Sequence, residues 1–370
     1  MTIINNAKFA LIAHPPDMNL YRAYIKYLKP GKNFRDALLL KLFEWAPSYK
    51  VKEFHRITFD KKKFAEGMMI MVPFLPEMKD IRFGEVLKKV EDAIAMAADA
   101  GCSVAALGAF TSIVIQGRED DFERKYTIKL TSGNTLTAAL IIQSIEDITE
   151  KFNMDLKEQA LAIIGASGDI GSGCMSWFGD KVKKMYLTAR GVSSLQTIVD
   201  KYSDTIKCEY EISNDNETAV KNATIVLFTT SAYTTLFSID DFNPGTVVCD
   251  ASAPLNVTAP KTLRPDVFLY HGGIAALPFT IDPGFDIGLA STSNLYGCMT
   301  EGICMSLDHS LPSSKGRGNI TRDKITVYKT VLENTPGLDA ALTVGNKTYS
   351  RNELENYSKE WQHAQCASRN

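Results

Sequence analysis

A glycine-rich segment in the middle of the chain limits the possible folds more than any other feature of the sequence. An apolar run at 160–164 leads into Gly165, Gly168 and Gly171, and a helical pattern follows. Side chains at these positions would hold the backbone away from a bound pyrophosphate, which the free amides at a helix start attract. The segment predicts a strand, a phosphate-binding turn and a helix, with the contact residues Gly165, Ala166, Ser167, Gly168, Asp169, Ile170 and Gly171. A glycine-rich turn without a ligand is the alternative.

The alternation of strands and helices continues beyond this segment and sets the fold class. Apolar runs recur, with helical segments between some of them, at 183–190, 223–230, 246–252 and 267–273. Strands separated by helices imply right-handed crossovers and a parallel sheet that is covered on both faces. We therefore expect an α/β protein with an N-terminal α/β domain (1–133), a central Rossmann-like doubly wound parallel sheet (134–290) and a helical C-terminal region (291–370).

Helical periodicity marks the parts on either side of the central domain. Apolar residues recur every three or four positions within 83–100, which predicts a helix, and 104–110 is typical of a buried strand. Further helices are expected at 291–307, 323–332 and 351–367. A Ser-, Gly- and Pro-rich stretch at 311–319 predicts a mobile connector.

Composition excludes several classes of protein. Lys and Arg number 41 and Asp and Glu 43, a formal charge of −2, so the concentrated positive charge that nucleic acid and anionic membranes require is absent. The most apolar stretch, 93–115, contains Asp99 and several Gly and Ser residues, which favours a buried helix and strand over a transmembrane segment. An odd number of cysteines, seven, and a start without a signal pattern favour a cytoplasmic protein with free thiols.

The end of the second strand indicates which dinucleotide is bound. Arg190 stands nineteen residues after Gly171, where an NAD site usually has an acid that would repel a 2′-phosphate. Because an arginine pairs with phosphate, we expect NADPH; a solvated arginine at a strand end is the alternative. Thr229, Thr230 and Ser231 end the next apolar strand and are candidates for ribose or phosphate contact.

The second half of a reductase site must bind and activate the substrate. No Tyr is followed four residues later by Lys, and neither Cys-x-x-Cys nor His-Glu-x-x-His occurs, so short-chain and zinc alcohol dehydrogenases and a metal site are not supported. Cys298 lies near the start of a predicted helix, where its thiol pKa can be lowered, and Glu301 shares its helical face. A buried packing role is the alternative for Cys298 and the expectation for Cys304.

Several stretches together resemble the long-chain acyl-[acyl-carrier-protein] reductases of cyanobacteria, which form fatty aldehydes. They occur in the right order between about residues 70 and 305: Phe74-Leu75-Pro76-Glu77-Met78, Ala106 to Ile113, Thr131-Ser132-Gly133-Asn134-Thr135, Gly165 to Gly171 with Leu187 to Arg190, and Gly297-Cys298-x-x-Glu301. Two positions depart from that family: Leu136 stands where the family has His, and His271 where it has Asn.

The resemblance implies that the N-terminal domain binds substrate, that the middle domain binds NADPH and that Cys298 is the acylated nucleophile. It implies an acyl-carrier-protein or coenzyme A thioester as substrate and an aldehyde-processing enzyme as a further partner. Ser112, Asn134 and Thr135 are then candidates to stabilise the oxyanion. An apolar tunnel is expected between 106–115 and the helix that carries Cys298, and basic patches at Lys88–Lys89 or 181–184 are candidate docking sites for the carrier.

Two other functions fit the same residues less fully. An NADP-dependent hydroxy-acid or keto-acid dehydrogenase of the shikimate-dehydrogenase type would use acid–base rather than covalent chemistry. A non-catalytic NADPH sensor would bind the dinucleotide without turning over a thioester. Formation of an acyl adduct on Cys298 distinguishes the acyl-thioester reductase from both of these functions.

Overall fold

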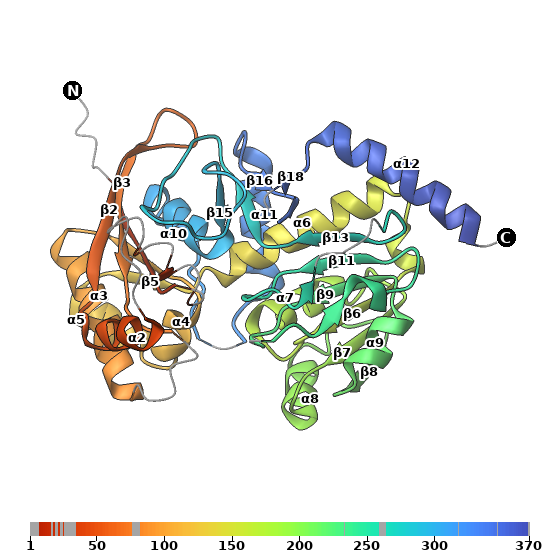
Figure 1. Cartoon of the computed structure of the whole chain (residues 1–370), viewed down its shortest axis with the longest axis horizontal. Helices are drawn as coiled ribbons and strands as arrows, with labels where there is room; N and C mark the ends of the chain where they lie inside the picture. The colour runs from red at the N-terminus through yellow and green to blue at the C-terminus, as the bar shows by residue number, and fades with distance from the viewer. Residues whose placement is uncertain are drawn as a thin grey trace. The chain divides into compact units, whose positions relative to one another are not determined.

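The computed structural model describes residues 7–15, 18, 21, 22, 25, 35–75, 82–232, 234–258, 264–316, 318–345 and 347–368. The chain forms two compact units (Figure 1). The first contains residues 1–136, 276–317 and 332–338, and the second contains 137–275, 318–331 and 339–370. This grouping differs from the expected division at 133 and 290, because the helix that carries Cys298 packs on the N-terminal sheet instead of forming part of a separate C-terminal region.

Five strands form the sheet of the first unit, in the order β2, β3, β1, β4, β5. The last four run parallel, and β2 is an antiparallel edge strand. Gly67 lies opposite Phe9, and a Cβ atom at position 67 would lie 2.4 Å from the Phe9 ring. The strands are β1 (Ala7–Ala13), β2 (Tyr49–Ile57), β3 (Ala65–Met71), β4 (Val104–Leu107) and β5 (Lys129–Thr131).

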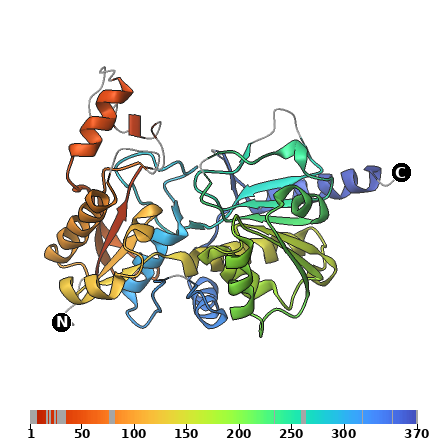
Figure 2. The same cartoon turned by 90° about the horizontal axis from the view of Figure 1, so that it is seen from below.

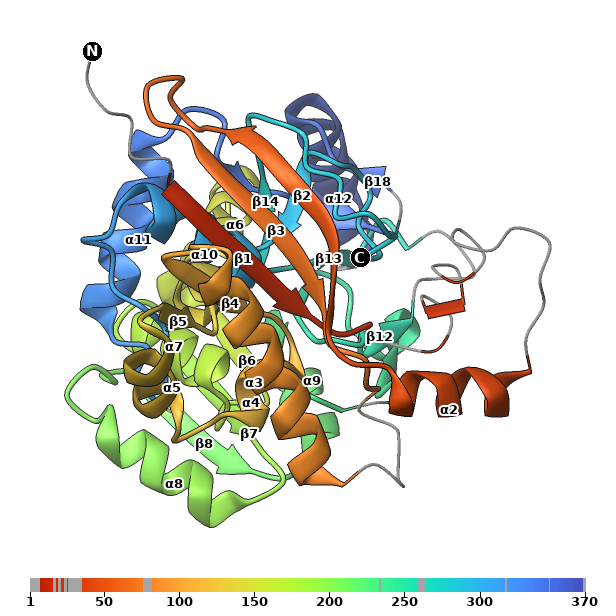
Figure 3. The ribbon, with the colours of Figure 1, turned by 90° about the vertical axis from the view of Figure 1, so that its left-hand side faces the viewer.

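Two helices cover opposite faces of this sheet. Ala10 and Ile12 of β1 form a core with α3 (Phe83–Asp99). On the other face, α10 (Gly297–Leu307) approaches β4 so closely that a Cβ atom at Gly302 would lie 2.6 Å from the Cβ atom of Ala106. Figure 2 shows α3 in orange and α10 in blue on either side of the strands, and Figure 3 shows β2, β3 and β1 side by side. The other helices of this unit are α2 (Asp36–Trp45), α4 (Phe110–Val114) and α5 (Glu119–Tyr126).

Eight strands form the sheet of the second unit, in the order β18, β17, β13, β11, β9, β6, β7, β8. The six strands from β13 to β8 are parallel, whereas β17 and β18 are antiparallel additions. The chain runs outward from β6 to β8 and then crosses to β9, so the strand order reverses between β6 and β9. The strands are β6 (Ala160–Ile164), β7 (Lys184–Thr188), β8 (Glu209–Ser213), β9 (Ile225–Phe228), β11 (Val247–Asp250), β13 (Phe268–His271), β17 (Thr343–Val344) and β18 (Lys347–Thr348).

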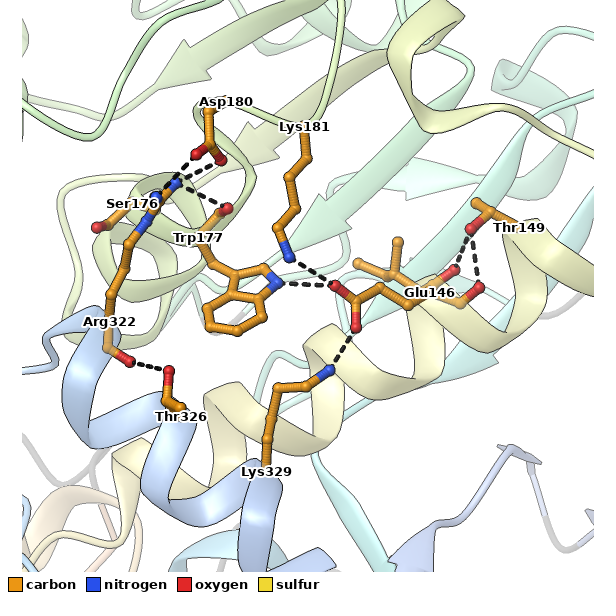
Figure 4. Close-up of polar contacts among 10 residues, drawn as sticks. Glu146, Thr149, Ser176, Trp177, Asp180, Lys181, Arg322, Thr326 and Lys329 are labelled. Carbon is orange, nitrogen blue, oxygen red and sulfur yellow. Dashed lines mark hydrogen bonds and ion pairs between the residues drawn. The ribbon is translucent and has the colours of Figure 1, made fainter. Parts of the chain in front are cut away.

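Charged side chains tie α11 to the rest of the second unit. Glu146 accepts hydrogen bonds from Trp177 Nε1 (2.8 Å) and Lys181 Nζ (3.2 Å), and Lys329 on α11 also donates to it (Figure 4). Arg322, the first residue of α11, donates to two carbonyls at the end of α7. The helices of this unit are α6 (Asn134–Lys151), whose first turn belongs to the first unit, α7 (Asp169–Phe178), α8 (Val192–Lys201), α9 (Asn216–Asn222), α11 (Arg322–Asn334) and α12 (Arg351–Ser368).

The remaining elements are short. They are the 3₁₀ helices Leu156–Glu158 and Ile239–Asp241 and the strands β10 (Phe237–Ser238), β12 (Val257–Thr258), β14 (Ile274–Ala276), β15 (Asn294–Tyr296) and β16 (Asp339–Ala340). Within the described ranges, none of the helices combines the length and the apolar character needed to cross a bilayer.

The mixed α/β class and the doubly wound parallel sheet are confirmed, and so is the helix expected at 83–100. Two local predictions are wrong. The helix expected from 291 begins at Gly297, because 294–296 form β15. Ser314, in the connector expected to be mobile, is only 3% exposed and is held by hydrogen bonds. Pro76, Glu77 and Met78 lie outside the described residues.

Candidate active site

Cys298 is the second residue of α10, directly after the turn from β15 into the helix. Its side chain is half-buried, whereas Cys304 on the same helix is only 4% exposed, as its predicted packing role requires. The backbone amides of Ala109 and Met299 donate to the Cys298 sulfur. The sulfur therefore lies where a thiolate would be stabilised by fixed backbone dipoles.

The expected lowering of the Cys298 pKa is wrong in direction. Burial raises the pKa of the thiol to about 11, and the nearby Glu301 carboxyl adds to the rise, although the backbone amides act the other way. Burial dominates because moving a charged sulfur out of water costs more than the amide dipoles return. Cys298 is therefore a protonated thiol at neutral pH, and attack by its sulfur requires that the proton be given up during the reaction.

Gly133 lies directly against the backbone of Cys298. A Cβ atom at position 133 would lie 2.1 Å from Cys298 Cα and 2.2 Å from its carbonyl oxygen, and Gly133 has a φ of +66°. Both the contact and the left-handed conformation require glycine. The backbone at Gly133 thus lies directly against that of Cys298 at the start of α10.

Glu301 is fully buried and serves as the acceptor that holds this loop in place. Oε2 accepts from the Leu136 amide (2.8 Å), Oε1 accepts from the Ser314 amide (3.2 Å), and the hydroxyls of Ser314 and Thr131 also donate to the carboxyl. Burial raises the pKa of the Glu301 carboxyl, against the effect of these donors. Glu301 therefore joins the connector at Ser314 to the loop that covers Cys298.

The three candidate oxyanion residues have different surroundings. The Thr135 amide donates to Ser314 Oγ (2.9 Å), which places Thr135 in the Glu301 cluster. Asn134 begins α6. The Ser112 hydroxyl donates to the Ala109 carbonyl within its own turn (3.1 Å). Leu136 is fully buried. The oxyanion roles stay predictions.

Sequence reasoning missed two features of this site. Ser314 is 183 positions from Thr131, and nothing local to either residue indicates that they meet. Ala109 has a φ of +53° and a ψ of −132°, a strained conformation for a residue with a Cβ atom. The turn between Gly108 and Phe110 is what directs the Ala109 amide toward the sulfur, and a positive φ at alanine has no sequence signal.

The glycine-rich turn of the second unit lies where the strand order reverses. A Cβ atom at Gly165 would lie 2.9 Å from the Thr229 carbonyl oxygen, and one at Gly171 would lie 2.6 Å from the Gly165 carbonyl oxygen. These two glycines allow α7 to pack closely on β6 and β9. The first amides of α7 precede the first helical bond, Ser172 N to Gly168 O (2.8 Å), and so have no partner within the helix. The residues present fit a bound dinucleotide.

The other candidate cofactor residues lie at the same edge of this sheet. Arg190 is exposed two residues after β7, and it forms no ion pair with any residue in the described part of the chain. Thr229 Oγ1 lies 3.3 Å from the carbonyl oxygens of Ile164 and Gly165, so it supports the turn, whereas Ser231 is exposed. The Asp169 carboxylate accepts from the Gly318 amide (2.8 Å).

The apolar tunnel stays a prediction, although α10 and β4 are in direct contact where Gly302 meets Ala106. A depression of about 450 Å³ in the first unit is lined by residues of the segment 281–294. The docking role predicted for Lys89 is not supported. Lys89 is buried and donates to the carbonyls of Phe43, Glu44 and Pro73, so it is not a docking residue. Half-buried His271 ends β13, and burial lowers its pKa.

The fold defines the class of the second unit: a Rossmann-type nucleotide-binding architecture with a glycine-rich turn at its switch point. No protein-family model matches the sequence. A long-chain acyl-[acyl-carrier-protein] reductase from Synechococcus elongatus is 30% identical over 208 residues, which are 51% of this chain and 58% of that protein. The aminotransferase PigE from a Serratia species is 23% identical over 335 residues, 88% of this chain and 38% of that protein. The chain thus spans less than two-thirds of either relative.

Two solved structures align with parts of the chain at low sequence identity and low TM-score. The nucleotide-binding domain of glutamyl-tRNA reductase from Thermoplasma volcanium is 19% identical, with a TM-score of 0.27, over 36% of this chain and 84% of that chain. L-tryptophan dehydrogenase from Nostoc punctiforme is 11% identical, with a TM-score of 0.34, over 70% of this chain and 67% of that chain.

Proposed function

We propose that this protein is an NADPH-dependent oxidoreductase that reduces a long-chain acyl thioester to a fatty aldehyde through a covalent acyl-Cys298 intermediate. The observation that carries the proposal is the setting of Cys298: a half-buried residue at the start of α10 whose sulfur accepts from the backbone amides of Ala109 and Met299. The 30% identical stretch shared with an acyl-[acyl-carrier-protein] reductase supports the same activity.

The first stage transfers the acyl group to the protein. Cys298 Sγ attacks the thioester carbonyl carbon, the bond from that carbon to the carrier sulfur breaks, and the thiol proton of Cys298 ends on the departing carrier thiol. Reactant and products therefore carry the same number of protons. The amides of Ala109 and Met299 stabilise the negative sulfur as it forms, which offsets part of the cost of burial.

The second stage releases the aldehyde. NADPH supplies a hydride when bound, and the hydride must reach the acyl carbon on Cys298. Hydride addition leaves a negative charge on the former carbonyl oxygen; as that oxyanion becomes the aldehyde carbonyl, the carbon–sulfur bond breaks, and the Cys298 thiolate takes up one proton from water. Covalent attachment holds the acyl carbon in place for this step, which makes it effectively unimolecular.

Three groups of residues position the reacting atoms in this account. Gly133 and the Glu301 cluster fix the backbone of Cys298, and Thr135 is held in the same cluster through Ser314. The turn at Gly165–Gly171 and the start of α7 bind the pyrophosphate, and the exposed Arg190 binds the 2′-phosphate that distinguishes NADPH from NADH. The acyl group arrives on an acyl carrier protein or coenzyme A, and an aldehyde-processing enzyme receives the product.

Product analysis tests the activity. We expect gas chromatography to detect fatty aldehyde after incubation with NADPH and a panel of acyl-carrier-protein and acyl-coenzyme A thioesters. Cys298→Ser should abolish aldehyde formation, because a serine hydroxyl is a far weaker nucleophile. Cys208→Ser is the matched control, since Cys208 is also half-buried but lies in the second unit. Aldehyde from Cys298→Ser, or none from the native chain on any thioester, refutes the proposal.

A further inference from the structure

His14 lies immediately after β1 and is almost completely buried. Its Nδ1 atom lies 2.7 Å from the Pro15 carbonyl oxygen, and its Nε2 atom accepts the Phe110 amide hydrogen at 3.1 Å. These contacts place the ring proton on Nδ1 and leave Nε2 as an acceptor. Burial lowers the pKa of His14 to about 4, so the ring is neutral at physiological pH.

The hydrogen bond from Phe110 is made next to the strained turn at Ala109. The Ala109 amide, which donates to the Cys298 sulfur, and the Phe110 amide lie in adjacent peptide planes. Ala109 keeps its φ of +53° only if its surroundings hold it there, because this conformation costs about 1–3 kcal/mol. The Phe110 amide and the hydrogen bonds of Thr111 to Gly108 hold both sides of the turn.

The His14 ring also packs between aromatic side chains. Its centroid lies 4.4 Å from the centroid of Phe74 and 5.8 Å from that of Phe110. These contacts and the hydrogen bond to Pro15 fix the orientation of the ring. The acceptor nitrogen therefore has one position, and the turn that it holds has one geometry.

We propose that His14 is a positioning residue for Cys298: its imidazole accepts the Phe110 amide hydrogen and so holds the turn in which the Ala109 amide points at the Cys298 sulfur. The inference rests on the proposed role of Cys298 as a nucleophile. His14 itself touches neither the sulfur nor a substrate. Its effect on Cys298 is transmitted through the backbone of residues 108–110.

Alkylation of Cys298 by iodoacetamide tests this role without any acyl thioester. The variant His14→Phe keeps an aromatic ring but removes the acceptor, whereas His14→Gln places an amide oxygen near the position of Nε2. We expect His14→Phe to slow alkylation of Cys298 about tenfold at about pH 8, because loss of the Ala109 hydrogen bond reduces the thiolate fraction. His14→Gln should stay within about twofold of the native rate.

Peptide mapping by mass spectrometry gives the rate at Cys298 and, as an internal reference, at Cys208, which should not change in either variant. Loss of structure would expose the sulfur and raise its rate, so a tenfold fall cannot come from unfolding. If His14→Phe does not fold, His14→Asn is the second variant without an acceptor at Nε2, with the same fall expected.

Two outcomes overturn the inference: an unchanged or higher Cys298 rate in the variant without the acceptor, or an equal fall in His14→Gln. Because no thioester is present, a failure of this inference is distinguishable from a failure of the proposed function. If alkylation is slower in His14→Phe but no thioester acylates Cys298 in the native protein, the positioning role of His14 is supported and the proposed reaction is refuted.

Discussion

Replacement of Gly133 by alanine should displace Cys298. The new Cβ atom would lie 2.1 Å from Cys298 Cα, whereas non-bonded carbons settle at about 3.5–4.0 Å, so the two segments must separate by more than about 1 Å. The left-handed φ of +66° adds about 1–2 kcal/mol of strain for a residue with a side chain, and forced overpacking adds about 1–3 kcal/mol. We expect Gly133→Ala to lower the free energy of unfolding by about 2–5 kcal/mol.

The matched control is Gly117→Ala. Gly117 has a φ of +82°, but a Cβ atom there would have no other atom within 4 Å, so this variant carries the backbone strain without the contact. Urea denaturation should show a loss of only about 1 kcal/mol for it. Displacement of the nucleophile by about 1 Å should cost about a hundredfold in aldehyde formation by Gly133→Ala, with little change for Gly117→Ala. Equal stability and equal activity in the two variants would show that Gly133 does not position Cys298.

Three further predictions follow from individual side chains. Arg190→Glu should raise the KM for NADPH about 10–100-fold and change the KM for NADH little, because it replaces the cation expected at the 2′-phosphate by a repelling charge. An unchanged ratio of the two KM values in steady-state kinetics would show that Arg190 is not part of the cofactor site. The rate of Cys298 alkylation should rise with pH up to about 11, since only the thiolate reacts and burial raises the thiol pKa to that value; a plateau near neutral pH would contradict the burial argument. Lys89→Met should cost about 2–4 kcal/mol in thermal or chemical unfolding, because it leaves three buried carbonyls without their donor, whereas the exposed neighbour Lys88→Met should change stability by less than about 0.5 kcal/mol.

Local patterns were enough to predict the nucleotide-binding half of the fold. The turn from Gly165 to Gly171 and the strands around it are determined by residues near one another in sequence, so periodicity and glycine spacing carry the signal. The position of Cys298 near a helix start could also be predicted. The first residue of α10 could not be predicted, because the apolar residues of β15 continue the apolar pattern of that helix.

The missing parts of the candidate site depend on contacts between distant residues. Glu301 reaches Leu136, 165 positions away, and His14 reaches Phe110, 96 positions away. The direction of the Cys298 pKa was mispredicted for a related reason: a position at a helix start is visible in sequence, whereas burial of the sulfur depends on the segments that cover it. Neither a buried carboxyl with four donors nor a strained alanine can be recognised without the tertiary structure.

Intact-protein mass spectrometry tests the covalent intermediate most directly. The native chain is mixed with a long-chain acyl thioester without NADPH, and the adduct is located by peptide mapping. We predict one acyl group on Cys298, none on Cys304, and loss of the adduct with release of aldehyde once NADPH is added. Aldehyde formation by a chain that never carries an acyl group, or an adduct on Cys298 that NADPH does not discharge, would contradict the account.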